Sequence, residues 1–365
     1  MVVPFYGLDR FFLRHKEVLE KLTSEVMASG QYFNEKYTQA FEARLALQCH
    51  RKYAISTGSC TDALFFALMA LGIRQGDKVV VPSVSFMATV TPVMRAGAVP
   101  VFADVDPVNG LICAKHLEKL MQQHEIKAVI GVDLYGNLPG ADLVKRVVQH
   151  FHVPYIEDAA QSIGSVRDGA VAGSMGTISC VSFDPTKVIH AFGSGGAVLT
   201  DDASVADKIR RLRYHGKSGN EHLEHGYNSR INATQAVLLN FQLEVLDDII
   251  ASRNHCAKSY DNAIAGKKSL HCLTSPNSLS NFHKYVIVCD DRDGLKLFLE
   301  QRGIQTMIHY PRPLFSYELF RNSPHVAEGI TETQPFCDKV LTLPLHTFMK
   351  EEDLLYICDT LQQIP

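Results

Sequence analysis

The sequence predicts an α/β protein with a mainly parallel central sheet flanked by helices, followed by a smaller α+β unit. Between residues 52 and 202, short β-branched runs alternate with helical segments, which is the pattern of parallel strands joined by crossover helices. Several of these runs are apolar almost throughout, as is typical of strands covered on both faces. The chain has 365 residues, which is enough for more than one hydrophobic core.

Six strands and three intervening helical segments are expected in this first region. The strands are Lys78–Pro82, Val99–Val105, Lys127–Leu134, Val153–Glu157, Ile178–Phe183 and Gly196–Thr200. The helical segments are Thr61–Leu71, Ala88–Ala96 and Gly140–His150.

One long helix is expected after Asn232, because apolar residues recur there at three- and four-residue spacing and form a single stripe. Beyond it, the pattern changes to a shorter series of strand, helix, strand and closing helix. We therefore expect a large domain over residues 1–235 with an N-terminal arm, a bridging helix over 236–266 and a small domain over 267–365. The stripe is Ala236, Leu239, Leu243, Leu246 and Ile250; the later elements are His283–Cys289, Gly294–Arg302, Ile304–His309 and Glu351–Gln362.

Composition and charge restrict the partners. The formal net charge of −3 leaves no basic surface for nucleic acid. The nine cysteines are scattered without a CxxC pair, so a disulfide framework is not expected and a reducing cytoplasm is the simplest compartment. The N-terminal residues lack the pattern of a signal peptide, and no apolar run approaches the roughly 20 residues of a membrane span. We expect a cytoplasmic protein with no membrane partner.

Chemically distinctive residues follow two of the predicted strands, and ligands bind beyond the carboxyl ends of strands in such sheets. Asp158 ends the run VPYIED, and Ser182 and Lys187 end the run ISCVSFDPTK. A third run, STGSCTDALFFAL, places Cys60 and Thr61 at the start of an apolar helix. The free amides of a helix start favour a bound phosphate.

A phosphate cup, an acid and a lysine are the groups that pyridoxal phosphate requires. The lysine holds the cofactor as a Schiff base, and the acid keeps the pyridine nitrogen protonated so that the ring acts as an electron sink. A lysine whose pKa is lowered by burial and neighbours can also carry the substrate proton.

Each feature has a plainer interpretation when it stands alone. A lysine after a strand is usually a solvated loop residue, and Asp158 or Ser59 could serve only as a cap. The run GSGG at 193–196 is most simply a flexible turn. The histidine pairs at 150 and 152 and at 222 and 225 join no cysteine or acidic cluster, so no metal site is expected. The prediction depends on the ordered combination.

The chain resembles the DegT/DnrJ/EryC1/StrS family of sugar aminotransferases, which are fold-type I pyridoxal-phosphate enzymes. The matching runs occur in family order over nearly the whole chain, and EDAAQ followed by SFxxxK is the most specific part. The runs are SCTDALFFALMALGIRQGDKVVVPSVSFMATV, GAVPVFADVDP, EDAAQSIG, SFDPTKVIHAFGSGGAVLTDD, GYNSRINATQA, IHYPRPLF and LTLPLH.

The resemblance implies a role for each matching residue of the cofactor site. Lys187 would form the Schiff base, Asp158 would face the pyridine nitrogen, and Gln161 would lie against the hydroxyl face of the ring. Phe86 would stack on the ring, although plain core packing is the alternative. The phosphate would be held by Ser182 and by the amides of Cys60, Thr61 and Asp62.

The resemblance also implies an assembly and a substrate side. Asn228 would reach the phosphate of the neighbouring subunit, which makes a homodimer part of the active site. Arg230 and His309 would contact substrate. Three positions depart from the family pattern: Ser194 replaces an acid, Phe315 replaces a histidine, and Asp184 stands where an aromatic residue is common. Family dehydratases carry histidine in place of the lysine, so Lys187 argues against that reaction.

The expected reaction is transamination of a keto- or aldehyde-sugar with L-glutamate as donor and pyridoxamine phosphate as the half-reaction form. The expected acceptor is a nucleotide-linked 3-keto or 4-keto deoxysugar, for an amino sugar of surface polysaccharide or lipopolysaccharide. One alternative acceptor is a free oxidised sugar acid such as an 8-oxo-3-deoxy-octulosonate. Another alternative is a non-catalytic regulator that binds a nucleotide sugar. A nicotinamide oxidoreductase is disfavoured because no GxGxxG follows the first strand.

Overall fold

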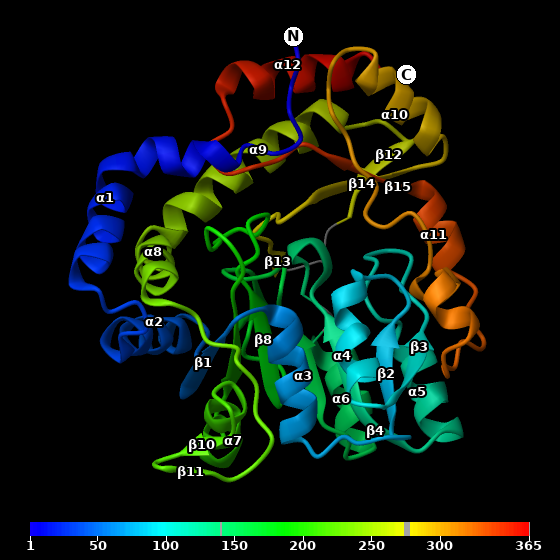
Figure 1. Ribbon diagram of the computed structural model, residues 1–365. Helices are drawn as coiled ribbons and strands as arrows, with labels where there is room; N and C mark the ends of the chain where they lie inside the picture. Colours follow the sequence, from blue (N-terminus) through cyan, green and yellow to red (C-terminus); the bar gives the residue numbers. More distant parts are fainter. Residues whose placement is uncertain (139–140, 274–277, 365) are drawn as a thin grey trace.

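The computed structural model describes residues 1–138, 141–273 and 278–364. Its centre is a seven-stranded sheet in the order β1-β9-β8-β5-β4-β2-β3 (Figure 1). The four strand pairs from β8 to β3 are parallel, and β9 pairs antiparallel with both β8 and β1. The strands are β1 (Tyr53–Thr57), β2 (Lys78–Pro82), β3 (Val99–Ala103), β4 (Ile126–Val132), β5 (Tyr155–Asp158), β8 (Ile178–Ser182) and β9 (Gly196–Thr200).

All six strands expected in this region are present, with β2 and β9 at the predicted bounds. The edge strand β1 was missed. Its last residues, Ser56 and Thr57, are polar yet fully buried, so the run lacks the apolar pattern of a strand. The backbone N–H and the hydroxyl of Ser56 both donate to Glu42 Oε1, at 2.8 and 2.7 Å. The hydrogen bonds to Glu42, fourteen positions earlier in the chain, therefore make the burial of Ser56 possible.

Helices cover both faces of the sheet, as expected for parallel strands. The predicted helix Ala88–Ala96 is wrong as one element: a 3₁₀ turn, Met87–Thr89, precedes a short helix with Pro92 in its first turn. Proline lacks the N–H of a continuous helix but is tolerated in a first turn. The expected start at Gly140 lies outside the described residues. The helices are α3 (Cys60–Ala70), α4 (Thr91–Arg95), α5 (Ala114–Gln123), α6 (Ala141–His150) and α7 (Ala203–Leu212).

The long helix expected after Asn232 is wrong as a single helix. It is divided into α8 (Ala233–Glu244) and α9 (Leu246–Ile264) by Val245, whose φ of −107° and ψ of 20° are not helical. Two N-terminal helices, α1 (Leu8–Ser29) and α2 (Glu35–Gln48), were not predicted and pack against α8 (Figure 1).

The C-terminal elements form a second layer above the large sheet in Figure 1. Their sheet has the order β12-β14-β15, and its core includes residues of α9, α10 and α12. The closing helix has the predicted bounds. The elements are β12 (Leu270–Cys272), β14 (Tyr285–Cys289), α10 (Arg292–Glu300), α11 (Thr333–Lys339), β15 (Val340–Leu343) and α12 (Glu351–Gln362).

The predicted strand Ile304–His309 is wrong. This segment makes only isolated bridges, from Ile304 to Val3 and from Met307 to Thr342, because it crosses from one partner to the other. Val3 thereby joins the core of the C-terminal unit. We propose that the large domain ends near residue 235 and the small domain begins near residue 267. The N-terminal segment at Val3 also packs on the small domain.

Short elements complete the described chain. They are β6 (Val166–Arg167), β7 (Ala170–Val171), β10 (Lys217–Ser218), β11 (Glu221–His222), β13 (Ser278–Leu279) and the 3₁₀ turns Leu134–Gly136, Leu314–Ser316 and Glu318–Arg321. All nine cysteines are unpaired. Within the described ranges, no helix has the length and apolar character to cross a membrane.

Candidate active site

A cavity of about 470 Å³ lies at the carboxyl ends of the parallel strands, the position at which such sheets bind ligands. It also receives residues from the N-terminal segment and from the C-terminal unit. Eight of the eleven predicted site residues line it: Cys60, Thr61, Phe86, Asp158, Gln161, Ser182, Lys187 and His309.

Asp158 is the last residue of β5 and is 3% exposed. Its Oδ2 accepts a 2.9 Å hydrogen bond from the hydroxyl of Thr89, and its Oδ1 accepts a 3.2 Å bond from the backbone N–H of Ala160. Burial raises the pKa of this carboxyl, while the two hydrogen bonds and Lys187 oppose the rise. The side chain is thus fixed in direction and suited to pair with a buried cationic group.

Lys187 follows β8 through a turn stabilised by Asp184. The backbone N–H of Lys187 donates to the Asp184 carbonyl at 2.9 Å, and the N–H of Thr186 donates to Asp184 Oδ1 at 3.0 Å. Burial lowers the pKa of the Lys187 ammonium, and the negative charges of Asp158 and Asp184 partly counteract it. A lowered pKa increases the fraction of the amine that is unprotonated, which is the form that acts as nucleophile or base.

The start of α3 lies beside this lysine and offers free backbone donors. Ser59 is the N-cap, and its Oγ accepts a 3.1 Å hydrogen bond from the N–H of Asp62. The N–H groups of Cys60 and Thr61 come before the first possible intrahelical acceptor, so they are available to an anion. Gly196 packs against this start: a Cβ there would lie 2.4 Å from the Cys60 nitrogen. Glycine is therefore required for β9 to approach the helix.

Three predicted residues do not line the cavity. The amide of Asp62 is already used by the Ser59 cap, and its carboxylate accepts from Ser229 Oγ and Arg95, both at 2.7 Å. Asn228 is exposed and bridges to Tyr214. Arg230 lines a separate cavity, with its guanidinium 3.8 Å from the centre of the Tyr214 ring. Their roles in the site stay predictions.

Gln161 and Phe86 both line the cavity next to Tyr310. The Oε1 of Gln161 accepts a 2.8 Å hydrogen bond from the N–H of Tyr135, and its Nε2 lies 3.5 Å from Tyr310 Oη. The Phe86 ring is 61% exposed, and its centre lies 6.4 Å from that of Tyr310. Since Phe86 is not in the core, its ring is available to a ligand.

Several cavity residues were not predicted. Thr89 orients Asp158, while Tyr6, His283, Lys284 and Tyr310 bring polar groups from distant parts of the chain. Only tertiary packing collects them, so no local spacing identifies them. Of the family departures, Ser194 and Asp184 line the cavity, whereas Phe315 packs on Phe102 with ring centres 5.6 Å apart. Ser85 and Thr186 also line the cavity without having been predicted.

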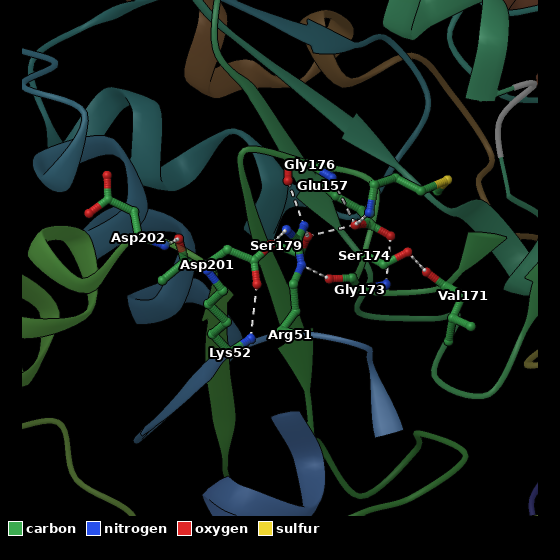
Figure 2. A network of polar contacts seen from close by, with 12 residues as sticks. Arg51, Lys52, Glu157, Val171, Gly173, Ser174, Gly176, Ser179, Asp201 and Asp202 are labelled. Atoms are coloured by element: carbon green, nitrogen blue, oxygen red, sulfur yellow. Dashed lines mark hydrogen bonds and ion pairs between the residues drawn. The ribbon is translucent and has the colours of Figure 1, made fainter. Parts of the chain in front are cut away.

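A buried polar network joins Glu157 of β5, the residue before Asp158, to the turn that leads into β8 (Figure 2). Glu157 is fully buried and accepts from the N–H groups of Gly173, Met175 and Gly176 at 2.7, 2.8 and 3.2 Å. It also accepts from the Ser179 hydroxyl at 2.6 Å. Arg51 donates to the carbonyls of Gly173 and Gly176 in the same turn and forms a 2.8 Å ion pair with Asp201, which follows β9. Glu157 therefore accepts from the backbone N–H groups of the turn that leads into β8, and these hydrogen bonds hold the turn in place.

The residues of this cavity fit pyridoxal phosphate. The free N–H groups at the start of α3 and the hydroxyl of Ser182 suit the phosphate. Asp158 suits the protonated ring nitrogen, and Lys187 suits the aldehyde. Phe86 presents an exposed ring for stacking. The cavity thus contains a group suited to the phosphate, to the ring nitrogen, to the aldehyde and to the face of the ring.

Comparison with known proteins agrees with this chemistry. Residues 14–362 match the DegT/DnrJ/EryC1/StrS aminotransferase family. The UDP-2-acetamido-2-deoxy-3-oxo-D-glucuronate aminotransferase of Pseudomonas aeruginosa is 32% identical and covers 99% of this chain and 99% of its own. A pleiotropic regulatory protein of Geobacillus stearothermophilus is also 32% identical, over 100% of this chain and 98% of its own.

Solved structures share the same fold. A DegT DnrJ EryC1 StrS aminotransferase from Brucella abortus has a TM-score of 0.93 and 32% identity, covering 99% of this chain and 98% of its own. The protein ntda of Bacillus subtilis, solved with bound cofactor pmp, has a TM-score of 0.88 and 27% identity, covering 99% and 84%. The chain belongs to the DegT/DnrJ/EryC1/StrS family and is a pyridoxal-phosphate-dependent aminotransferase with the fold-type I architecture.

Proposed function

We propose that the protein transfers the amino group of L-glutamate to the keto group of a nucleotide-linked sugar, with C3 as the aminated carbon. The observation that carries the proposal is the presence of Lys187 and Asp158 in one cavity of a chain with several relatives that are named for a 3-oxo, 3-dehydro or 3-amino sugar. Besides the Pseudomonas enzyme, these include a UDP-N-acetyl-3-dehydro-alpha-D-glucosamine 3-aminotransferase and a dTDP-3-amino-3,6-dideoxy-alpha-D-galactopyranose transaminase, at 31% and 28% identity. A 3-keto acceptor is therefore preferred to a 4-keto acceptor. We place the product in surface polysaccharide or lipopolysaccharide synthesis.

Bound pyridoxal phosphate supplies the electron sink for loss of the substrate proton. Lys187 would hold the cofactor covalently and, once released by the incoming amine, would move the proton at the substrate carbon. The lowering of its pKa by burial favours the unprotonated amine, which is the form that can accept this proton. Asp158 would keep the proton on the ring nitrogen, and its hydrogen bonds from Thr89 and Ala160 hold it in place without reorganisation.

We further propose a homodimer with shared active sites. Asn228 is exposed and lies outside the cavity of its own chain, so it is free to reach that of a second copy. Arg230 follows two positions later and is proposed to contact substrate from the same neighbouring chain. His309 lines the cavity directly and is proposed to contact substrate within its own chain.

A regulator that only binds a nucleotide sugar is the second candidate, because two relatives carry regulatory names, one of them a sensory transduction protein. Binding alone requires neither the lowered pKa of Lys187 nor an acid directed at a ring nitrogen. The aminotransferase is therefore favoured. The free oxidised sugar acid is retained as an acceptor to be assayed.

The test separates the two half-reactions. The purified protein, loaded with pyridoxal phosphate, is mixed with L-glutamate, and the spectrum is followed for conversion to the pyridoxamine form. The converted protein is then offered nucleotide-linked 3-keto and 4-keto sugars and the oxidised sugar acid, and products are identified by mass spectrometry. Conversion followed by amination at C3 supports the proposal. Tight sugar binding without any conversion by glutamate would establish the regulator instead.

A further inference from the structure

Lys284 is a second lysine in the cavity, and the proposed chemistry does not use it. It lies just before β14 and is 9% exposed, and it lines the cavity together with Lys187. Among the residues that the structure describes, no carboxylate lies within ion-pair distance of its ammonium group. Asp184 is the one acid that raises its pKa, and that side chain is itself exposed. Lys284 is thus a nearly buried cation without a paired anion.

The surroundings of Lys284 tolerate the charge without neutralising it. Its ammonium nitrogen lies 5.0 Å from the centre of the Phe5 ring and 4.7 Å from that of Tyr6. These cation–π contacts replace part of the lost hydration. Buried cations are normally paired with an anion. Among the described residues, no carboxylate pairs with Lys284, so the rest of its desolvation cost is not offset.

The backbone of Lys284 is held firmly in this position. Its N–H donates to the carbonyl of Tyr135 at 3.2 Å. The three residues immediately before Lys284 are held by the buried side chain of Arg253. This side chain donates to the carbonyls of Asn281, Phe282 and His283 at 3.1, 2.6 and 3.0 Å. The lysine is therefore presented to the cavity by a rigid support, which is the arrangement of a preorganised binding group.

We propose that Lys284 binds an anionic group of the substrate, either a carboxylate of the amino-acid donor or an acidic substituent of the acceptor sugar. The proposal rests on the proposed function and specifies its substrate class. Asp158 is already assigned to the ring nitrogen, and the start of α3 with Ser182 is assigned to the cofactor phosphate. Among the described residues of the wall, Lys284 is the remaining cationic side chain that has no assigned partner, and both proposed sources carry a compatible anion.

Titration of Lys284 gives the interaction a pH dependence. Burial, and then the charges of Arg253 and Lys187, lower its pKa to about 7, against the opposing effect of Asp184. Burial also lowers the pKa of His309 to about 3 and that of His283 well below its usual value, and it raises the pKa of the Tyr6 phenol. These three neighbours are uncharged at neutral pH. The cationic form of Lys284 is present below its pKa, so anion affinity falls as pH rises through about 7.

The first experimental arm measures the donor side. Glutarate, an unreactive dicarboxylate, is titrated calorimetrically into cofactor-loaded wild type, Lys284→Met and Lys284→Arg, with neutral glutaramide as the control ligand. If the donor supplies the anion, binding of glutarate should weaken about tenfold or more in Lys284→Met and stay near wild type in Lys284→Arg, while binding of glutaramide should not change. Unchanged cofactor absorbance and a melting temperature no lower than that of wild type serve as the folding control.

The second arm measures the acceptor side. UDP-glucuronate and UDP-glucose, which differ in the acid at C6, are titrated into the pyridoxamine form of the same proteins. If the sugar supplies the anion, wild type prefers UDP-glucuronate and Lys284→Met loses that preference. A change in only the first arm assigns Lys284 to the donor, and a change in only the second assigns it to an acidic sugar. Unchanged affinities in both arms would overturn the proposal.

A pH series provides a measurement that does not need the methionine variant. In the responsive arm, affinity in wild type should fall between pH 6 and 8.5, whereas in Lys284→Arg it should stay nearly constant, because arginine remains charged. Identical pH profiles would contradict the role of Lys284. Both arms measure binding and not turnover. A failure of glutamate to convert the cofactor would therefore reject the proposed function without imitating a failure of this proposal.

Discussion

The hydroxyl of Thr89 donates a 2.9 Å hydrogen bond to Oδ2 of Asp158, across 69 positions of sequence. Ser85 Oγ lies 2.8 Å from the same Thr89 hydroxyl, and Phe86 stands between these two residues in the chain. The segment that presents the exposed aromatic ring therefore also sets the direction of the acid. A ring stacked on Phe86 and a ring nitrogen facing Asp158 would be positioned by one rigid unit.

Substitution of Asp158 tests its electrostatic role. Asp158→Asn nearly preserves shape but removes the negative charge, so the cofactor should remain bound while turnover falls by about a hundredfold or more. The measurements are the cofactor spectrum and the steady-state rate with glutamate. Asp168→Asn, at an exposed position outside the cavity, is the matched control and should retain wild-type turnover. Normal turnover in Asp158→Asn would contradict the assignment.

Removal of Lys187 should abolish catalysis while the cavity remains. Lys187→Ala lacks the group that exchanges the cofactor and moves the proton, and loss of acid–base transfer costs roughly a hundred- to ten-thousandfold. Pyridoxamine phosphate should still bind, because the phosphate and ring-nitrogen partners are intact. Turnover with added cofactor is compared with that of Lys268→Ala, which changes an exposed lysine.

The same variant locates the covalent link. Borohydride reduction of the wild-type protein should abolish its yellow colour and leave the label on the peptide that contains Lys187. The variant should carry no such label. Turnover of Lys187→Ala within about tenfold of wild type, or label on another lysine, would exclude the assignment.

Mixed dimers test whether Asn228 acts across a subunit boundary. Asn228→Ala should weaken cofactor retention, because a donor to the phosphate of the other subunit is lost. In mixtures of Asn228→Ala with Lys187→Ala, one site of each heterodimer contains both native residues. Activity above that of either parent is expected after mixing and reassembly. If the mixture is no more active than its parents, each site is built within one chain.

The network around Glu157 should contribute to stability. In Glu157→Gln, the amide oxygen can replace Oε2, which accepts three hydrogen bonds, but the amide NH₂ then faces the N–H of Gly173. A buried donor without an acceptor costs about 1–3 kcal/mol. Urea unfolding should show this loss in the free energy of unfolding. Glu125→Gln, at an 83% exposed side chain, should change it by less than about 0.5 kcal/mol.

The elements predicted best are those whose signal is local. The strand β2 is an apolar run that ends at Pro82, and its bounds follow from that pattern alone. The strand β1 depends on a partner outside its own run: Ser56 is buried because Glu42 accepts its hydrogen bonds. Segment 304–309 has the composition of a strand, yet the backbone it meets changes from Val3 to Thr342 along its length.

The same distinction applies to the site. Asp158 ends β5 and Lys187 follows β8 after a short turn, so the sequence places both at one edge of the sheet. Thr89, Tyr6 and Lys284 reach the cavity from three other segments, and nothing in their local sequence marks them. Their positions depend on tertiary contacts, such as the rigid support that Arg253 gives to the segment before Lys284.

The contact of the N-terminal segment with the C-terminal unit gives the site an order of assembly. The N–H of Phe5 donates to Gln305 Oε1 at 2.9 Å, across 300 positions, and Tyr6 follows it on the cavity wall. A chain that ends before Ile304 would possess the acid, the lysine and the helix start, but not this part of the enclosure. Closing so long a loop is entropically costly and comes late in folding. Retention of the cofactor should therefore be a property of the finished chain, acquired after the large sheet has formed.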